Sequence, residues 1–226
     1  MMTALLPLTL LGALVGLDTV SFPQAMLSRP LVAATLGGAL LGSPLEGLFV
    51  GAALELIALE TLPFGASRYP EWGSASVVGG ALFASSPTPE PGSMTLALLA
   101  SLATAWVGGW TMVKLRQRNA TWAARSRSAL DAGSRGAVIG LQLKGLTADL
   151  VRGALLTAVA VGTFAPLTEA SVALWNVDAR VSRAITVGAA TSVAVGAAWK
   201  LFHGSMSARW LFFAGLGLGF TVAVLR

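Results

Sequence analysis

The sequence lacks cysteine, has a single histidine and is poor in charged residues. Without cysteine it cannot form disulfides, thiolate zinc sites or iron–sulfur clusters, and it has no thiol nucleophile. One histidine leaves little for a metal site or a Ser-His-Asp triad, so we expect no metal, no cofactor and no catalytic residues. Charged residues make up 11% of the chain, against roughly 25% in a soluble domain. This composition argues against a soluble globular enzyme and against a disordered tail.

The chain is instead rich in apolar sequence, since 55% of its 226 residues are hydrophobic. Uncharged runs of about 20 residues can each cross a bilayer core of about 30 Å. Ser93–Val113 is the clearest such run. No basic residue precedes the apolar run Met1–Leu17, so we expect a retained membrane segment rather than a secretory signal. We therefore predict an all-α, polytopic integral membrane protein with one membrane-embedded domain over residues 1–226.

Several apolar segments are short and interrupted by proline or glycine. Leu31–Gly42 is too short to span a bilayer alone at 1.5 Å per residue. The next helix is expected over Pro44–Leu62, with Ser43 as its N-cap and Glu46 closing a capping box. Further apolar segments follow at Gly73–Ala84, Gly153–Leu167, Ala184–Leu201 and Trp210–Leu225. Interrupted segments of this kind are typical of the discontinuous or re-entrant helices of transporters.

Glycine pairs four residues apart recur in the apolar segments, at Gly12/Gly16, Gly38/Gly42 and Gly47/Gly51. Small residues at this spacing let two helix backbones approach closely in a membrane. We interpret these pairs as packing positions rather than as a functional motif.

The basic residues cluster in one stretch, residues 114–135, between hydrophobic blocks. Its members are Lys114, Arg116, Arg118, Arg125, Arg127 and Arg135. Such a cluster predicts a cytoplasmic loop, because loops on the cytoplasmic side carry an excess of lysine and arginine. No nucleic-acid module accompanies it, so no nucleic-acid partner is expected. Gly136–Val151, amphipathic through Lys144 and Asp149, is expected to lie at the membrane interface.

Glu55 is the most informative ionisable residue, because it lies in the middle of an apolar helix. A charge at the bilayer centre costs at least about 2.5 kcal/mol, and no residue three or four positions away can neutralise this one. Glu55 therefore needs a partner from elsewhere. Two roles are open: a ligand contact, such as a carboxylate accepting sugar hydroxyls, or a structural bond to the backbone of another broken segment.

Other polar residues near the helix breaks are weaker candidates. Arg29, just before Pro30, is expected either to cap a half-helix or to pair with Glu55, and Gln24 is placed to line a cavity. Glu60 points to a different helix face from Glu55 and lies close to the break at Pro63. Three further residues are expected at the surface unless their loop re-enters the membrane: Arg68, Tyr69 and Glu71.

The segments Arg29–Leu36, Gly37–Gly42 and Gly51–Leu59 carry a resemblance to a known family. Their order, with Arg-Pro-Leu, a glycine turn and Gly-x-x-x-Glu-Leu, is similar to IIC subunits of the mannose–fructose–sorbose family of the phosphoenolpyruvate-dependent sugar phosphotransferase system. Trp210–Gly215 also resembles a late family segment. The resemblance covers most of the chain and is strongest over its first third.

The resemblance implies a multi-pass subunit of the bacterial inner membrane that is not itself an enzyme. Family members pair with a second membrane subunit, IID, in trimers of the pair, and together they bind a hexose-type sugar and move it inward. Soluble IIB, charged by IIA, then phosphorylates the sugar. Carried over by position, and with the candidates named above, the predicted substrate-binding residues are Glu55, Gln24, Arg29, Glu60, Gly65, Ala66, Pro70 and Glu71.

Two other interpretations remain open. Pro63 and Glu60 depart from residues common at these positions in the family. The first alternative is therefore a degenerate IIC-like subunit that docks or regulates phosphotransferase proteins without transport. The second is an unrelated secondary transporter that couples a proton to Glu55.

Overall fold

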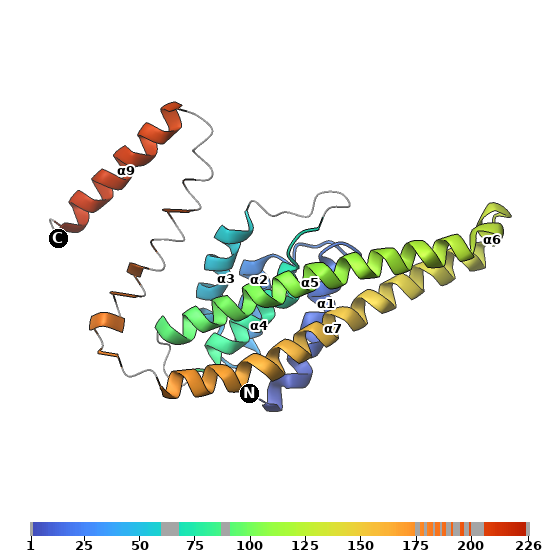
Figure 1. Cartoon of the computed structure of the whole chain (residues 1–226), viewed down its shortest axis with the longest axis horizontal. Helices are drawn as coiled ribbons and strands as arrows, with labels where there is room; N and C mark the ends of the chain where they lie inside the picture. Colours follow the sequence, from blue (N-terminus) through green and yellow to red (C-terminus); the bar gives the residue numbers. More distant parts are fainter. Residues whose placement is uncertain are drawn as a thin grey trace. The chain divides into compact units, whose positions relative to one another are not determined.

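Helices make up all the regular secondary structure of the described residues, which are 2–59, 68–86, 91–174, 177–178, scattered positions between 180 and 199, and 206–224 in this computed structural model. The chain divides into two units, Met1–Asp178 and Ala179–Arg226. The first unit (Figure 1) comprises η1 (Met2–Ala4), α1 (Leu5–Asp18), α2 (Pro30–Ala39), α3 (Pro44–Ala58), α4 (Trp72–Ala84), α5 (Pro91–Arg125), α6 (Arg127–Asp131) and α7 (Arg135–Ala173). The second contains α9 (Met206–Val224).

Helix α4 is the centre of the first unit. Every residue from Trp72 to Phe83 is buried, and α4 contacts α1, α2, α3, α5 and α7. At 13 residues it is about 20 Å long, shorter than the bilayer core. The expected short apolar segment is therefore present, and protein surrounds it on every side.

Close backbone contact explains why the central helices are rich in glycine. A methyl group on Gly80 would lie 2.1 Å from the Ala34 carbonyl oxygen, and one on Gly47 would lie 2.3 Å from the same oxygen. A methyl group on Gly12 would lie 1.9 Å from the hydroxyl of Thr157 on α7. The packing role predicted for Gly12 and Gly47 is confirmed. Gly42 instead has a φ of +82° and open space around it, so it serves a turn.

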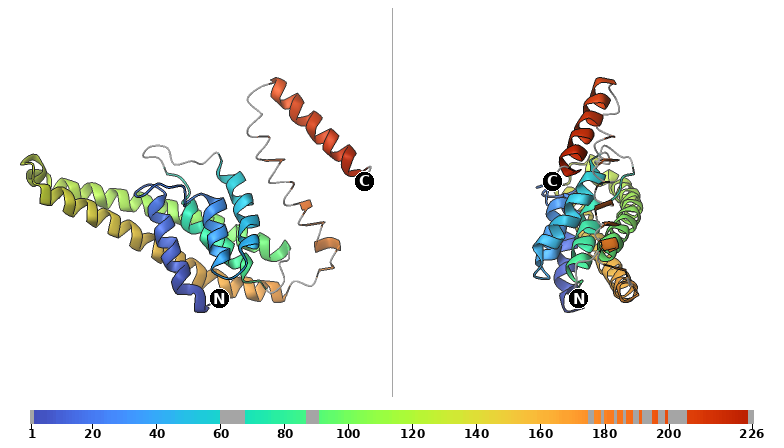
Figure 2. Two further views of the ribbon diagram at one scale, coloured as in Figure 1. Left: turned by 180° about the vertical axis from the view of Figure 1, so that it is seen from behind. Right: turned by 90° about the vertical axis from the view of Figure 1, so that its left-hand side faces the viewer.

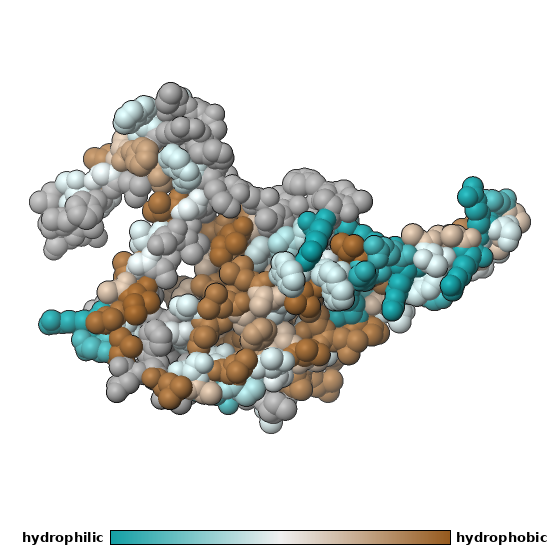
Figure 3. Space-filling view, viewed as in Figure 1, coloured by the Kyte–Doolittle hydropathy of each residue, from teal (hydrophilic) through white to brown (hydrophobic). Residues whose placement is uncertain are grey.

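Helices α5 and α7 form a long antiparallel hairpin, with α6 at its tip (Figure 2). The basic stretch at 114–135 was expected as a loop, and that prediction is wrong: α5 runs on to Arg125 and α7 begins at Arg135. Residues 114–125 contain alanine, arginine and glutamine and no proline, so the helix continues to Arg125. Figure 3 shows hydrophilic residues gathered along the outer hairpin and hydrophobic residues over the bundle.

Helix α7 is continuous, whereas the sequence predicted separate segments at Gly136–Val151 and Gly153–Leu167. The polar residues at the expected break neutralise one another, because Arg152 Nε lies 2.9 Å from Asp149 Oδ1 one turn away. Both side chains are buried, so this part of α7 does not lie free at an interface. The described residues contain two helices long and apolar enough to cross a membrane, Gly92–Arg125 and Arg135–Ser171.

The predicted start of the third helix is confirmed at Pro44, after Ser43 in the N-cap position. The capping box is not formed, since the Ser43 side chain makes no capping hydrogen bond. Glu46 still lies in the first turn, where an acidic residue interacts favourably with the helix dipole.

Candidate functional site

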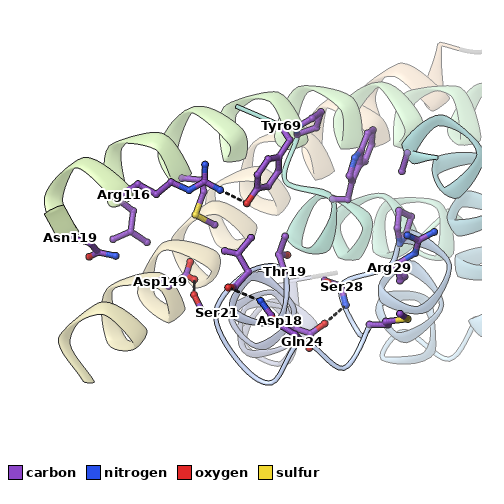
Figure 4. A pocket seen from close by; sticks show the side chains of 18 residues that line it. Asp18, Thr19, Ser21, Gln24, Ser28, Arg29, Tyr69, Arg116, Asn119 and Asp149 are labelled. Carbon is purple, nitrogen blue, oxygen red and sulfur yellow. Dashed lines mark hydrogen bonds between the residues drawn. The ribbon is translucent and has the colours of Figure 1, made fainter. Parts of the chain in front are cut away.

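A cavity of about 740 Å³ opens in the first unit, where α1, the loop after it, the segment before α4, and helices α5 and α7 meet (Figure 4). Its polar lining residues are Asp18, Thr19, Ser21, Gln24, Ser28, Arg29, Tyr69, Arg116, Asn119 and Asp149. Carboxyl and guanidinium groups are equal in number in this lining. Hydroxyl and amide groups supply the rest, so the cavity suits an uncharged ligand rich in hydrogen-bonding groups.

Asp18 builds the floor of the cavity. It ends α1, is 2% exposed, and accepts hydrogen bonds from the backbone N–H groups of Ala25 (2.6 Å) and Ser28 (2.9 Å). The loop that follows α1 has two non-glycine residues at positive φ, Gln24 at 59° and Met26 at 62°. Such conformations persist only where the surroundings hold them. The Asp18 carboxylate therefore fixes the loop that lines the cavity.

Asp149 joins the same loop to the hairpin. Its Oδ2 accepts a hydrogen bond from the Ser21 hydroxyl, and its Oδ1 accepts one from Arg152 Nε. Asp149 is 1% exposed, and Arg152 also donates weakly to the Gly16 carbonyl on α1, at 3.5 Å. This network ties α1, the loop and α7 together behind the cavity wall.

Tyr69, Arg116 and Asn119 line the side of the cavity facing the Asp18 loop (Figure 4). Arg116 Nη2 donates to the Tyr69 hydroxyl, and its guanidinium lies 4.9 Å from the Tyr69 ring centre. Burial raises the pKa of the Tyr69 phenol above its ordinary value, so the phenol stays neutral and keeps its proton. In the described part of the chain, the buried Oδ1 of Asn119 has no hydrogen-bond partner.

The residues before α4 are not at the surface as the sequence predicted, apart from Arg68, which is exposed. Tyr69 is 7% exposed and Glu71 is fully buried. The segment docks on α5: the Glu71 N–H donates to the Ala105 carbonyl at 2.9 Å, and Gly109 lies directly against the Tyr69 backbone. Glu71 caps α4 by accepting from the Ser74 N–H, so its role here is structural.

Glu55 forms the ion pair with Arg29 that was one of the two predicted roles of that arginine. The second Glu55 oxygen accepts from the backbone N–H of Leu31 at 3.1 Å, in the first turn of α2. Glu55 thus makes the structural bond to another broken segment that the sequence left open. It does not line the cavity, whereas Arg29 does. Contact between Glu55 and a ligand stays a prediction.

Three of the predicted site residues are therefore at the cavity: Gln24, Arg29 and Pro70. Glu60, Gly65 and Ala66 lie outside the described residues, as does Pro63. The sequence reasoning missed the site roles of Asp18, Tyr69, Arg116, Asn119 and Asp149. One signal was available for Asp18: it is the single acid at the end of an apolar run, followed by Ser21, Gln24 and Ser28.

A comparison of three variants separates a positioning role of Glu55 from direct ligand contact. The ion pair is partly exposed, at 34% for Arg29 and 19% for Glu55, so losing it should cost about 1 kcal/mol of stability. If Glu55 acts only through Arg29, the double variant R29Q/E55Q should bind ligand no more weakly than R29Q alone. Affinities and melting temperatures of R29Q, E55Q and the double variant measure this coupling. Additive losses of affinity would contradict the positioning role.

Comparison with known proteins finds a matching family and a curated relative of this chain. The family described as the sorbose-specific IIC component of the PTS system matches residues 1–225. The PTS system sorbose-specific EIIC component of Lacticaseibacillus casei is 36% identical over 67 residues, which are 30% of this chain and 24% of that relative. The aligned part therefore spans about a quarter of the length of the curated relative.

Two solved structures share the fold. One, described only as a membrane protein, superposes with a TM-score of 0.70 at 21% identity, covering 99% of this chain and 87% of the other. The second is the cryo-EM structure of the mannose transporter ManYZ in complex with microcin E492, with a TM-score of 0.63 at 21% identity over 100% of this chain and 88% of the other. The predicted all-α membrane fold is confirmed.

Proposed function

We propose, because the chain belongs to the family of sorbose-specific IIC components of the phosphotransferase system, that it is the sugar-translocating membrane subunit of such a system and holds the sugar in the cavity at Asp18 and Asn119. The proposal extends to a multi-pass placement in the bacterial inner membrane. It also includes a IID partner, which the likeness to the ManYZ transporter supports. Trimers of the IIC–IID pair are part of the same proposal.

The position of the cavity carries this proposal. Met112 and Leu115 line it from the apolar part of α5, while Arg116 and Asn119 line it at the start of the basic part. Basic segments face the cytoplasm. A sugar in this cavity is therefore placed where a cytoplasmic phosphocarrier can reach it, and soluble IIB, charged by IIA, would carry out the phosphoryl transfer.

The lining offers groups that a neutral hexose can use. Tyr69 keeps a proton to donate, and the Asn119 amide offers an acceptor that is unused in the described part of the chain. Most other polar groups of the cavity are already occupied, since Asp18 holds the loop and Asp149 holds Ser21 and Arg152. Sugar contact is therefore assigned to Asn119 and Tyr69 on the cavity wall, and to Gln24 through its Oε1, since the Gln24 Nε2 already donates to the Val20 carbonyl at 2.9 Å.

Membrane vesicles test the function when they contain the chain, its IID partner, soluble IIA and IIB, and the soluble phosphocarrier proteins that pass the phosphoryl group from phosphoenolpyruvate to IIA. We expect sugar to be phosphorylated inside the vesicles only when phosphoenolpyruvate is supplied. Uptake of unmodified sugar driven by a pH gradient would instead support the proton-coupled transporter. Binding of a soluble phosphocarrier without either activity would support the docking subunit.

Substitution of Asn119 by leucine tests the cavity itself. The Asn119 Oδ1 is buried and has no partner among the residues that the structure describes, so removing the amide should leave the melting temperature unchanged or higher. Sugar affinity should fall about three- to tenfold, the value of one lost hydrogen bond. Binding by isothermal titration and melting by scanning fluorimetry measure the two effects.

Q142L is the matched control, because Gln142 is exposed on α7 away from the cavity. It should leave affinity unchanged. Equal affinity in the N119L variant and the wild type would place the sugar elsewhere. A large loss of stability in N119L would show instead that the amide is structural.

A further inference from the structure

A second hollow lies between α5 and α7, within the first unit. This hairpin groove encloses about 840 Å³ and is lined by Val107, Trp110, Thr111, Lys114, Leu115, Gln117, Arg118, Thr121, Trp122, Ala148, Val151, Arg152, Leu155, Leu156 and Val159. No acidic residue is among these lining residues, and most of the wall is apolar. The groove shares Leu115 with the wall of the first cavity, and its Arg152 belongs to the hydrogen-bond network at Asp149.

The groove is apolar at one end and basic at the other. Gly108 of α5 lies against Leu156 of α7, so Val107, Leu155 and Val159 line one end of the groove, and Lys114 and Arg118 lie nearer the hairpin tip. From Val107 to Arg118 is about 16 Å along α5, close to half of a 30 Å bilayer core. Trp110 and Trp122 flank the basic part, and tryptophan is enriched where a membrane meets water.

Arg152 adds a buried donor to this wall. Its side chain is 8% exposed, and Asp149 and Gly16 occupy its Nε and Nη2. Its Nη1 is buried and has no hydrogen-bond partner among the described residues. A buried N–H without an acceptor is costly, so an oxygen atom that enters the groove would be stabilised there.

We propose that the hairpin groove binds one anionic phospholipid, with an acyl chain along Leu155 and Val159 and the phosphodiester beside Lys114, Arg118 and Arg152. The charge of the groove favours this occupant, since basic pockets between membrane helices bind anionic headgroups. A zwitterionic lipid would bring a second, positive group that meets no acid in the lining. Selectivity for phosphatidylglycerol over phosphatidylcholine is therefore the distinguishing property.

Photo-crosslinking tests this proposal on the full chain together with its membrane partner. Proteoliposomes carry photoreactive phosphatidylglycerol or photoreactive phosphatidylcholine, and mass spectrometry maps the crosslinked peptides. In the wild type, photoreactive phosphatidylglycerol should label residues 107–118 and 148–159 more strongly than photoreactive phosphatidylcholine does. Labelling by phosphatidylglycerol should be about thirtyfold weaker in the K114Q/R118Q variant, which is the effect of losing two basic contacts to an anionic headgroup.

R127Q/R135Q is the matched control, because it removes the same charge from exposed positions outside the groove. A second variant, L155W, fills the apolar end without changing charge and should reduce groove labelling by either lipid. Equal labelling by the two lipids, or an equal loss in both double-charge variants, would overturn the proposal. Crosslinks from the groove to the membrane partner in place of lipid would also overturn it.

Discussion

Replacement of Asp18 by alanine should abolish sugar transport while the helices remain folded. The carboxylate holds the backbone N–H groups of Ala25 and Ser28, and hydrogen bonds to a charged group contribute about 1.5–3 kcal/mol each. Without them, nothing compensates the positive φ angles at Gln24 and Met26. The loop faces the cavity, so water can satisfy its freed backbone groups. The loss is therefore expected as local unfolding of residues 19–29 rather than global unfolding.

Hydrogen exchange measures this local loss. Peptides covering residues 19–29 of D18A should exchange faster, while α4 peptides keep their protection. The D131A control removes an acid whose partner Arg127 is 3.7 Å away and whose side chain is 72% exposed, so transport and exchange should stay as in the wild type. Unchanged exchange in the D18A loop, with transport retained, would refute the role given to Asp18.

The helix starts of the first unit could be predicted because their signals are local. Pro30 and Pro44 each occupy the first position of a helix, where the fixed φ of proline fits and its missing N–H costs nothing. The isolated charge of Glu55 likewise predicted a distant partner, and Arg29 provides it. The signal in each case is local, although the partner of Glu55 lies 26 residues away.

The walls of the cavity could not be predicted in the same way. Ser21 and Asp149 are 128 residues apart, and Tyr69 and Arg116 are 47 apart, so no sequence window contains both partners. The sequence pattern placed Asp149 on the polar face of an interfacial helix. An aspartate can lie on such an exposed face or in a buried hydrogen-bond network, and the pattern does not distinguish the two. Only the packing of α1 against α7, through Gly12 and Gly153, decides that it is buried.

The basic stretch shows a related limit of sequence patterns. The charge pattern indicates which side of a membrane a segment faces, but it does not distinguish a loop from a helix. Helix propensity favours continuation to Arg125, and the chain reverses after α6 at Gly133, whose φ is +70°. The extended hairpin is what creates the groove between α5 and α7.

Substitution of Gly80 by alanine should destabilise the whole first unit. The added methyl group would lie 2.1 Å from the Ala34 carbonyl oxygen and 2.7 Å from its carbonyl carbon, which are backbone atoms of α2. Backbone cannot rotate away as a side chain can, so α2 and α4 must separate. Overpacking of this kind costs about 1–3 kcal/mol and sometimes more. We expect the melting temperature to fall by about 2–12 °C, at about 2–4 °C for each kcal/mol in a chain of this size.

G162A is the matched control, because it also replaces a helical glycine by alanine but is not expected to lower the melting temperature. Gly162 is also helical, on α7, but no atom of the other described segments lies within 4 Å of an added methyl group. Alanine is the better helix former by about 0.8–1 kcal/mol, so this variant should melt at the same temperature or slightly higher. Scanning fluorimetry of the 7 tryptophans in detergent compares the two. Equal melting of G80A and G162A would mean that α2 and α4 are not in backbone contact. The inference that α4 holds α2 in place, and so positions Arg29 at the cavity, would then be wrong.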